Sequence, residues 1–224
     1  CTVYNMMRLA DFLFRRTGDA AYMDYWERNL YNGIMAQGYW RGSFTHGRKS
    51  MYPEEGLLTY FLPLRAGGQK GWSSRTQDFF CCHGSLVQAN AAHNTGMYYA
   101  GEDSLYVCQY FDSEYRGKIG NTAVIVQEKI NSLSGSEHLS SDSPGRQKIT
   151  DVTARQPFHP DRLVFDLEIE AEGEKEFSIC IRIPWWIQGN PVILVDGQTA
   201  DVEAEKSSFA RTKRVWSRNI IHIE

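Results

Sequence analysis

The spacing of apolar residues changes once along the chain, near Gly101, and this change limits the possible folds more than any other feature. Before Gly101, apolar residues recur at the spacing of one face of an α-helix. After it, apolar and polar residues alternate, as in half-buried β-strands. We therefore expect an α+β protein of two domains, with helices over residues 1–102 and an antiparallel β-sandwich over residues 103–224.

The first half predicts three helices. The first helix ends at Gly18, a residue suited to close a helix, and Asp19 is suited to cap the second. A third helix is expected from about Leu86 to Tyr99. The first two carry apolar stripes, which we interpret as packing faces. These stripes comprise Met6, Met7, Ala10, Leu13 and Phe14 in the first helix and Tyr22, Trp26, Leu30 and Ile34 in the second.

The second half predicts short strands separated by turns such as Asp196-Gly197, with a surface loop over Ser132–Gly145. The strands are expected near residues 105–111, 122–130, 147–154, 162–170, 176–183, 191–195 and 219–224. Between the halves, the connection from Gly38 to Phe80 is long and without clear period, which is often functional. Its expected features are a hairpin over Leu57–Leu64 and a set of polar and aromatic candidates to line a cleft. The candidates are His46, Tyr52, Tyr60, Trp72 and Arg75, and each of them alone is better explained as structural or solvated.

Composition excludes some functions and leaves others open. The net charge of −3 gives no basic footprint, so we expect no nucleic-acid partner. No apolar run approaches the length that spans a bilayer, and no signal peptide is evident, so we expect no membrane partner. The chain begins at Cys1, inside an apparent helix, as a piece of a longer polypeptide would. The compartment and the oligomeric state therefore stay open.

Two adjacent cysteines, Cys81 and Cys82, are the strongest candidates for chemistry. Ser85 and Gln88 form a capping-box pattern that predicts a helix start just after the pair. The positive end of a helix favours thiolate, the form that acts as nucleophile or soft metal ligand. The alternatives are a buried apolar pair and a redox dithiol. An odd count of five cysteines argues against a disulfide framework.

The other cysteines divide into two kinds. Cys108 and Cys180 lie in apparent strands and are interpreted as buried hydrophobic residues. Cys1, Cys81 and Cys82 form the set that could share one metal ion, although their spacing matches no zinc-finger pattern.

Several motifs in order along the chain carry a resemblance to a known family. They are Cys1, Leu13–Asp19, Glu27–Gly33, Cys81-Cys82, Asp103–Val107 and Ile181–Trp186. Together they resemble glycoside hydrolase family 127, whose characterised members include β-L-arabinofuranosidases of bacteria. The resemblance implies that residues 1–102 are the last helices of an (α/α)6 barrel, followed by a β-sandwich.

The resemblance also implies a catalytic site. In that family one glutamate and three cysteines hold Zn²⁺, and the first cysteine of the adjacent pair is the nucleophile of a retaining mechanism. Carried over, Cys1, Cys81 and Cys82 are the metal ligands and Cys81 is the nucleophile, acting on an oligosaccharide or a polysaccharide side chain. The zinc-binding and acid/base glutamates are expected before Cys1, so the piece alone is expected to be inactive. His83-Gly84-Ser85 departs from the family pattern and leaves the sugar undetermined.

A different class of function is a non-catalytic carbohydrate-binding or scaffold protein. Consecutive Trp185 and Trp186 could stack on a glycan, although packing of these rings on the barrel is the simpler interpretation. A third class is a redox or structural-zinc protein that uses Cys81 and Cys82.

Overall fold

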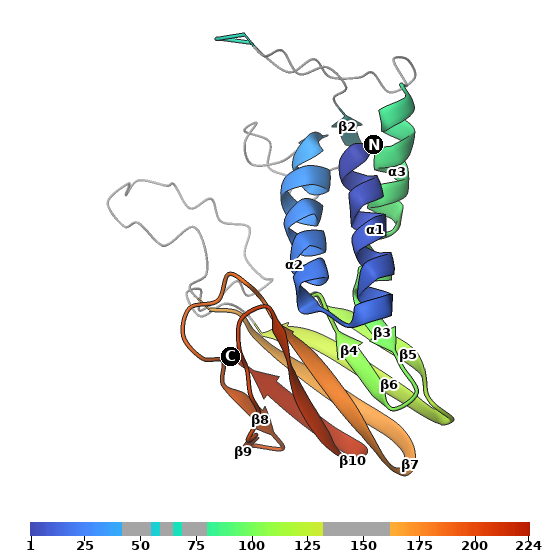
Figure 1. The fold of residues 1–224 in the computed structure, drawn as a ribbon, viewed down its shortest axis with the longest axis vertical. Helices are drawn as coiled ribbons and strands as arrows, with labels where there is room; N and C mark the ends of the chain where they lie inside the picture. The colour runs from blue at the N-terminus through green and yellow to red at the C-terminus, as the bar shows by residue number, and fades with distance from the viewer. Residues whose placement is uncertain (42–54, 59–64, 69–79, 132–161) are drawn as a thin grey trace, which may run out of the picture. The chain divides into compact units, whose positions relative to one another are not determined.

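The computed structural model describes residues 1–41, 55–58, 65–68, 80–131 and 162–224. Residue packing divides the chain into two compact units, Cys1–Met97 and Tyr98–Glu224. The first unit holds the helices and the second a large sheet, which confirms the mixed α+β class (Figure 1). The division precedes residue 102 because strand β3 (Tyr98–Ala100) pairs with β4 (Ser104–Val107). Within the described ranges, no helix has the length and apolar character needed to cross a membrane.

Helix α1 (Thr2–Thr17) ends where the sequence predicts. Gly18 adopts a left-handed conformation with φ 70°, and its N–H donates to the Phe14 carbonyl at 2.7 Å. A residue with a Cβ is strained in this conformation, which explains the glycine. Met7, Ala10 and Phe14 are buried, whereas Met6 is 42% exposed, so the buried stripe is narrower than predicted.

Helix α2 (Ala20–Asn29) starts with the predicted cap, because Asp19 Oδ1 accepts the Ala21 N–H at 2.9 Å. The chain continues through a π-helical turn (Leu30–Ile34) and a 3₁₀ turn (Met35–Gln37). Trp26, Leu30 and Ile34 are buried at four-residue steps, which confirms most of the second stripe.

Helix α3 (Cys81–Ala91) begins and ends earlier than predicted. A 3₁₀ turn (His93–Gly96) follows it, and the residues at 98–100 form β3 instead of a last helical turn. Strand β1 (Gly38–Arg41) pairs antiparallel with β2 (Glu55–Leu58). Leu57 and Leu58, which were expected to start a hairpin over 57–64, therefore pair with a strand that precedes them in the sequence. The rest of that hairpin and the side chains of His46, Tyr52, Tyr60, Trp72 and Arg75 lie outside the described residues.

The sheet of the second unit is centred on two long neighbouring strands, β7 and β10 (Figure 1). Its order is β3-β4-β7-β10-β8-β9, and the β5–β6 hairpin joins β7 through β6. The remaining bounds are β5 (Ser113–Ile119), β6 (Thr122–Asn131), β7 (Val164–Ile183), β8 (Ile193–Val195), β9 (Gln198–Thr199) and β10 (Ser208–Ile223).

The strand predictions are correct in part. Strands expected at 162–170 and 176–183 form the single strand β7, because both halves pair with β10 across a shift in register. β10 begins well before residue 219, and β5 was not expected. The expectation of a purely antiparallel sheet is wrong, because β4 runs parallel to β7. The long connection between the two strands makes this parallel pairing possible. The expected strand at 147–154 and loop Ser132–Gly145 lie outside the described residues.

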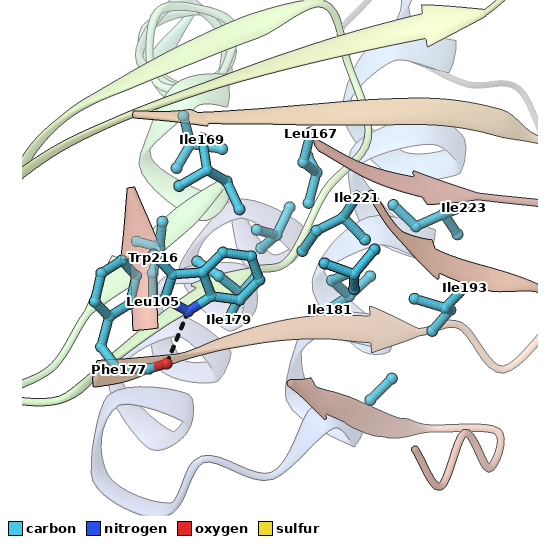
Figure 2. Packing of buried hydrophobic residues seen from close by; sticks show 14 of the residues in the cluster. Leu105, Leu167, Ile169, Phe177, Ile179, Ile181, Ile193, Trp216, Ile221 and Ile223 are labelled. Atoms are coloured by element: carbon cyan, nitrogen blue, oxygen red, sulfur yellow. Dashed lines mark hydrogen bonds between the residues drawn. The ribbon is translucent and has the colours of Figure 1, made fainter. Parts of the chain in front are cut away.

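The Asp196-Gly197 turn is confirmed. Both residues have positive φ, 51° and 79°, and they join β8 to β9 as a two-residue hairpin. The core of the sheet unit is an apolar cluster contributed by alternate positions of several strands. Figure 2 shows Trp216 within this cluster, where its indole N–H donates to the Phe177 carbonyl at 2.8 Å.

Candidate functional site

The three cysteines singled out in the sequence lie together in the helical unit. Cys1 precedes α1, and Cys81 and Cys82 are the first two residues of α3. The Sγ atoms of Cys1 and Cys82 are 3.2 Å apart, and those of Cys81 and Cys82 are 3.9 Å apart. All three Sγ atoms lie within 4.8 Å of one another. The fold therefore brings residues from two distant segments to one point.

A histidine explains why α3 starts at Cys81. Phe80 is extended, with φ −94° and ψ 167°, and its N–H donates to His83 Nδ1 at 2.9 Å. The His83 N–H in turn donates to the Phe80 carbonyl at 3.0 Å, and His83 is buried. The predicted Ser85–Gln88 cap is wrong, because the helix already starts at Cys81, five residues before the predicted start at Leu86. Cys81 and Cys82 therefore lie within the first helical turn.

Ser85 has a different place from the one predicted for it. Its Oγ lies 3.0 Å from Cys1 Sγ. Ser85 follows Cys81 by four positions, so the two share one face of α3. That spacing was visible in the sequence, but it became informative only once Cys1 was known to face the same side. Ser85 is a polar neighbour of the thiol cluster.

The surroundings of the cluster suit an anion or a soft metal ion. Cys1 and Cys81 are exposed and Cys82 is half-buried. The positive end of the α3 helix dipole favours negative charge there. Tetrahedral Zn²⁺ with three thiolates at about 2.3 Å separates the sulfurs by about 3.8 Å. The observed spacing fits this donor set with small adjustments. Among the described residues, the cluster contains no carboxylate.

The other two cysteines are buried in the sheet unit, as expected. Burial raises the pKa of Cys180 to about 11, so this thiol stays protonated at neutral pH. Trp185 and Trp186 come after β7, separated from it by Pro184, and are 42% and 43% exposed. Their exposure keeps a glycan-stacking role open for this segment.

Comparisons with known proteins match the helical unit and the sheet unit separately. A model of the β-L-arabinofuranosidase GH127 catalytic domain matches residues 1–95, and a model of the GH127 middle domain matches residues 138–221. No curated protein matches the sequence.

Solved structures of similar fold come from the same family. A GH127 β-L-arabinofuranosidase from Geobacillus stearothermophilus T6 is 20% identical, with a TM-score of 0.62 over 98% of this chain and 30% of its own. A second GH127 β-arabinofuranosidase is 18% identical, with a TM-score of 0.66 over 100% of this chain and 31% of its own. The chain thus spans about a third of the length of these structures. By the two family models that together cover most of its residues, the chain belongs to glycoside hydrolase family 127.

Proposed function

We propose that this chain provides the nucleophile and three metal-binding thiolates of a zinc-dependent retaining glycosidase that acts on L-arabinofuranosides. The observation that supports the proposal most is the meeting of Cys1, Cys81 and Cys82 Sγ atoms within 4.8 Å at a helix start. In this proposal the helical unit, Cys1–Met97, provides the last helices of an (α/α)6 barrel, and the sheet unit, Tyr98–Glu224, belongs to a β-sandwich. The substrate is an oligosaccharide or a polysaccharide side chain.

The proposed reaction has two displacements. Cys81 Sγ attacks the anomeric carbon and forms a C–S bond while the C–O bond to the leaving group breaks. A carboxylic acid gives its proton to the leaving oxygen. The resulting carboxylate then takes a proton from water, whose oxygen attacks the same carbon and releases the Cys81 thiolate. Two inversions retain the configuration.

The proposed roles of the side chains rest on the family resemblance together with their positions. Bound Zn²⁺ would keep the thiols deprotonated at neutral pH. Cys1 and Cys82 would hold the metal, and the exposed Cys81 would also meet the sugar. The start of α3 adds favourable charge for the thiolate. The glutamate ligand and the acid/base glutamate are proposed to come from polypeptide preceding Cys1, so we expect the 224-residue chain alone not to turn over substrate.

Metal analysis and a turnover assay test this function. We expect zinc in the purified chain, loss of zinc in Cys82→Ser, and retention in the matched control Cys108→Ala, whose thiol is buried in the sheet unit. A longer protein that includes the polypeptide before Cys1 should hydrolyse aryl β-L-arabinofuranosides and lose this activity with Cys81→Ala. Robust turnover by the 224-residue chain alone would contradict the proposed source of the acid.

One distance favours a second candidate function, a redox dithiol. The Cys1 and Cys82 sulfurs at 3.2 Å need little movement to form a disulfide. Mass spectrometry distinguishes the two functions. A metal-free protein with a reversible Cys1–Cys82 disulfide would favour redox chemistry, whereas bound zinc with free thiols favours the glycosidase.

A further inference from the structure

The sheet unit contains a pocket of its own, formed where the segment after β7 returns to β8. Its volume is about 580 Å³, within the range typical of small-molecule sites. Its described lining includes residues at the ends of β7 and β10 and most of the segment 184–192, with Trp185 and Gly189 excepted. We propose that this pocket is an accessory binding site for a neutral sugar residue, distinct from the cysteine site.

The floor of the pocket is a fixed stack of side chains. The Tyr110 and Phe165 rings have centroids 4.5 Å apart, and the Arg182 guanidinium lies 5.6 Å from the centre of the Tyr110 ring. Arg182 is fully buried, and its Nε donates to the Cys108 carbonyl at 2.6 Å. The Tyr110 hydroxyl donates to the Arg182 carbonyl. Because each group is held by another, the floor is formed before any ligand arrives.

The rim is also anchored. The Val192 N–H donates to the Glu224 carbonyl at 2.7 Å, and the Glu224 N–H donates to the Val192 carbonyl at 2.9 Å. Pro184 and Pro191 restrict the backbone near both ends of the segment. A rim so constrained loses little conformational freedom on binding, which favours affinity.

The lining has the chemistry that a sugar needs. The Trp186 ring lines the pocket and is 43% exposed, so it can stack on the C–H face of a sugar ring. The exposed amides of Gln188 and Asn190 can donate to and accept from sugar hydroxyls.

The charges of the lining favour an uncharged ligand. Arg162 and Glu224 form an ion pair with each other, and Arg182 is buried. The described lining residues therefore offer no exposed, unpaired charge to hold an ionic ligand. The chain belongs to a family of glycoside hydrolases, so the uncharged ligand that best fits this lining is a neutral glycan.

Trp185 provides a matched control for Trp186. The two indoles are neighbours in sequence and are exposed to the same extent, 42% and 43%, but only Trp186 is among the described residues that line the pocket. If the pocket is the binding site, loss of Trp186 should weaken sugar binding and loss of Trp185 should not. If sugars bind to any exposed aromatic side chain, loss of either tryptophan should have the same effect.

Sugar binding is measured on the full 224-residue chain carrying Cys81→Ala, so that neither turnover nor an intact cysteine site is needed. The probes are L-arabinose, arabinobiose, xylobiose and cellobiose, titrated by saturation-transfer NMR. We expect at least one to bind, with Kd raised about tenfold by Trp186→Ala and changed less than about twofold by Trp185→Ala. Asn190→Ala, an exposed rim substitution, should raise Kd several-fold without affecting folding.

Three results would overturn the site. The first is that no probe binds at concentrations up to tens of millimolar. The second is that Trp185→Ala and Trp186→Ala lower the sugar affinity equally. The third is that neither Trp186→Ala nor Asn190→Ala changes the sugar affinity. Near-UV circular dichroism checks that each variant is folded, and Trp186→Phe, which keeps a ring, should retain part of the affinity. The outcome does not depend on zinc or catalysis, so the accessory site and the proposed glycosidase can fail separately.

Discussion

Cys1 Sγ lies 3.2 Å from Cys82 Sγ, although 81 positions separate the two residues. Figure 1 shows the start of α1 beside the start of α3, where the two helices bring these thiols together. The geometry of the cluster therefore depends on how α1 and α3 pack. Substitutions that loosen this packing should affect the thiols without touching them.

Ser85→Ala should weaken zinc binding while leaving the helical unit folded. The Ser85 hydroxyl lies 3.0 Å from Cys1 Sγ and can donate to it, which would orient the thiolate for the proposed metal ion. Loss of such an outer partner typically lowers metal affinity by about tenfold or more. Competition with a chromogenic chelator measures the change. Thr95→Ala removes an exposed hydroxyl of the same unit that donates to the Ala92 carbonyl, and it should leave the affinity unchanged.

Glu128 makes the sheet unit sensitive to pH. It lies on the inward face of β6, opposite Ser113 and Leu167 in the register, and is 1% exposed. Burial raises the pKa of Glu128 to about 8, against hydrogen bonds from Tyr98 and Ser113 that favour the charged form. The folded protein therefore keeps a proton that the unfolded chain loses near pH 4.5.

The stability of the unit should consequently fall as the pH rises from about 4.5 to 8. Between these values unfolding releases the Glu128 proton, which contributes a slope of about −1.4 kcal/mol per pH unit to the free energy of unfolding. Urea unfolding at several pH values measures the slope, and Glu128→Gln should flatten it. Glu114→Gln is the control, because hydrogen bonding to Arg116 lowers the pKa of Glu114 and this exposed side chain is charged throughout the window. An unchanged slope in Glu128→Gln would refute the assignment.

Gly96→Ala should destabilise the helical unit by about 1–3 kcal/mol. A Cβ at Gly96 would lie 2.7 Å from Cζ2 and 2.8 Å from Cε2 of Trp26. The indole is 5% exposed and held in the core, so it cannot move aside cheaply. Thermal unfolding followed by far-UV circular dichroism measures the loss. Asn94→Ala, two residues away and exposed, should have little effect.

Trp216→Phe should cost the sheet unit about 2–4 kcal/mol. The side chain is fully buried, and its replacement leaves a cavity and removes the hydrogen bond that the indole N–H now donates to the Phe177 carbonyl (Figure 2). Chemical denaturation compares this variant with Val215→Ala, a neighbour that is 49% exposed. Equal effects of the two substitutions would show that the buried indole contributes no special stability.

Local sequence patterns predicted local features well. Gly18 and Asp19 set the end of α1 and the start of α2 through contacts within four residues, and Asp196-Gly197 sets a two-residue turn. The start of α3 was predicted wrongly although it too is local. The capping contact uses a His83 ring nitrogen, which is an uncommon acceptor for a helix N-terminus, whereas Ser85 and Gln88 matched a common pattern.

Long-range features required the folded chain. The alternation in β6 placed Glu128 at an inward position, but only its pairing with β5 and β7 shows that a carboxyl is buried there. Likewise, two predicted strands became β7 because β10 extends along both of them.

The sequence by itself determined the change from helices to strands, the cap and turn residues, and the candidacy of Cys81 and Cys82. The residue pattern indicated Cys1 only as a possible third metal ligand, and its proposed role came from the family resemblance. Tertiary structure decided that the three sulfurs meet, that Ser85 lies beside Cys1, and that Trp186 lines a pocket while Trp185 does not. The physical reason is range: periodicity and capping act over a few residues, whereas these contacts depend on how distant segments pack.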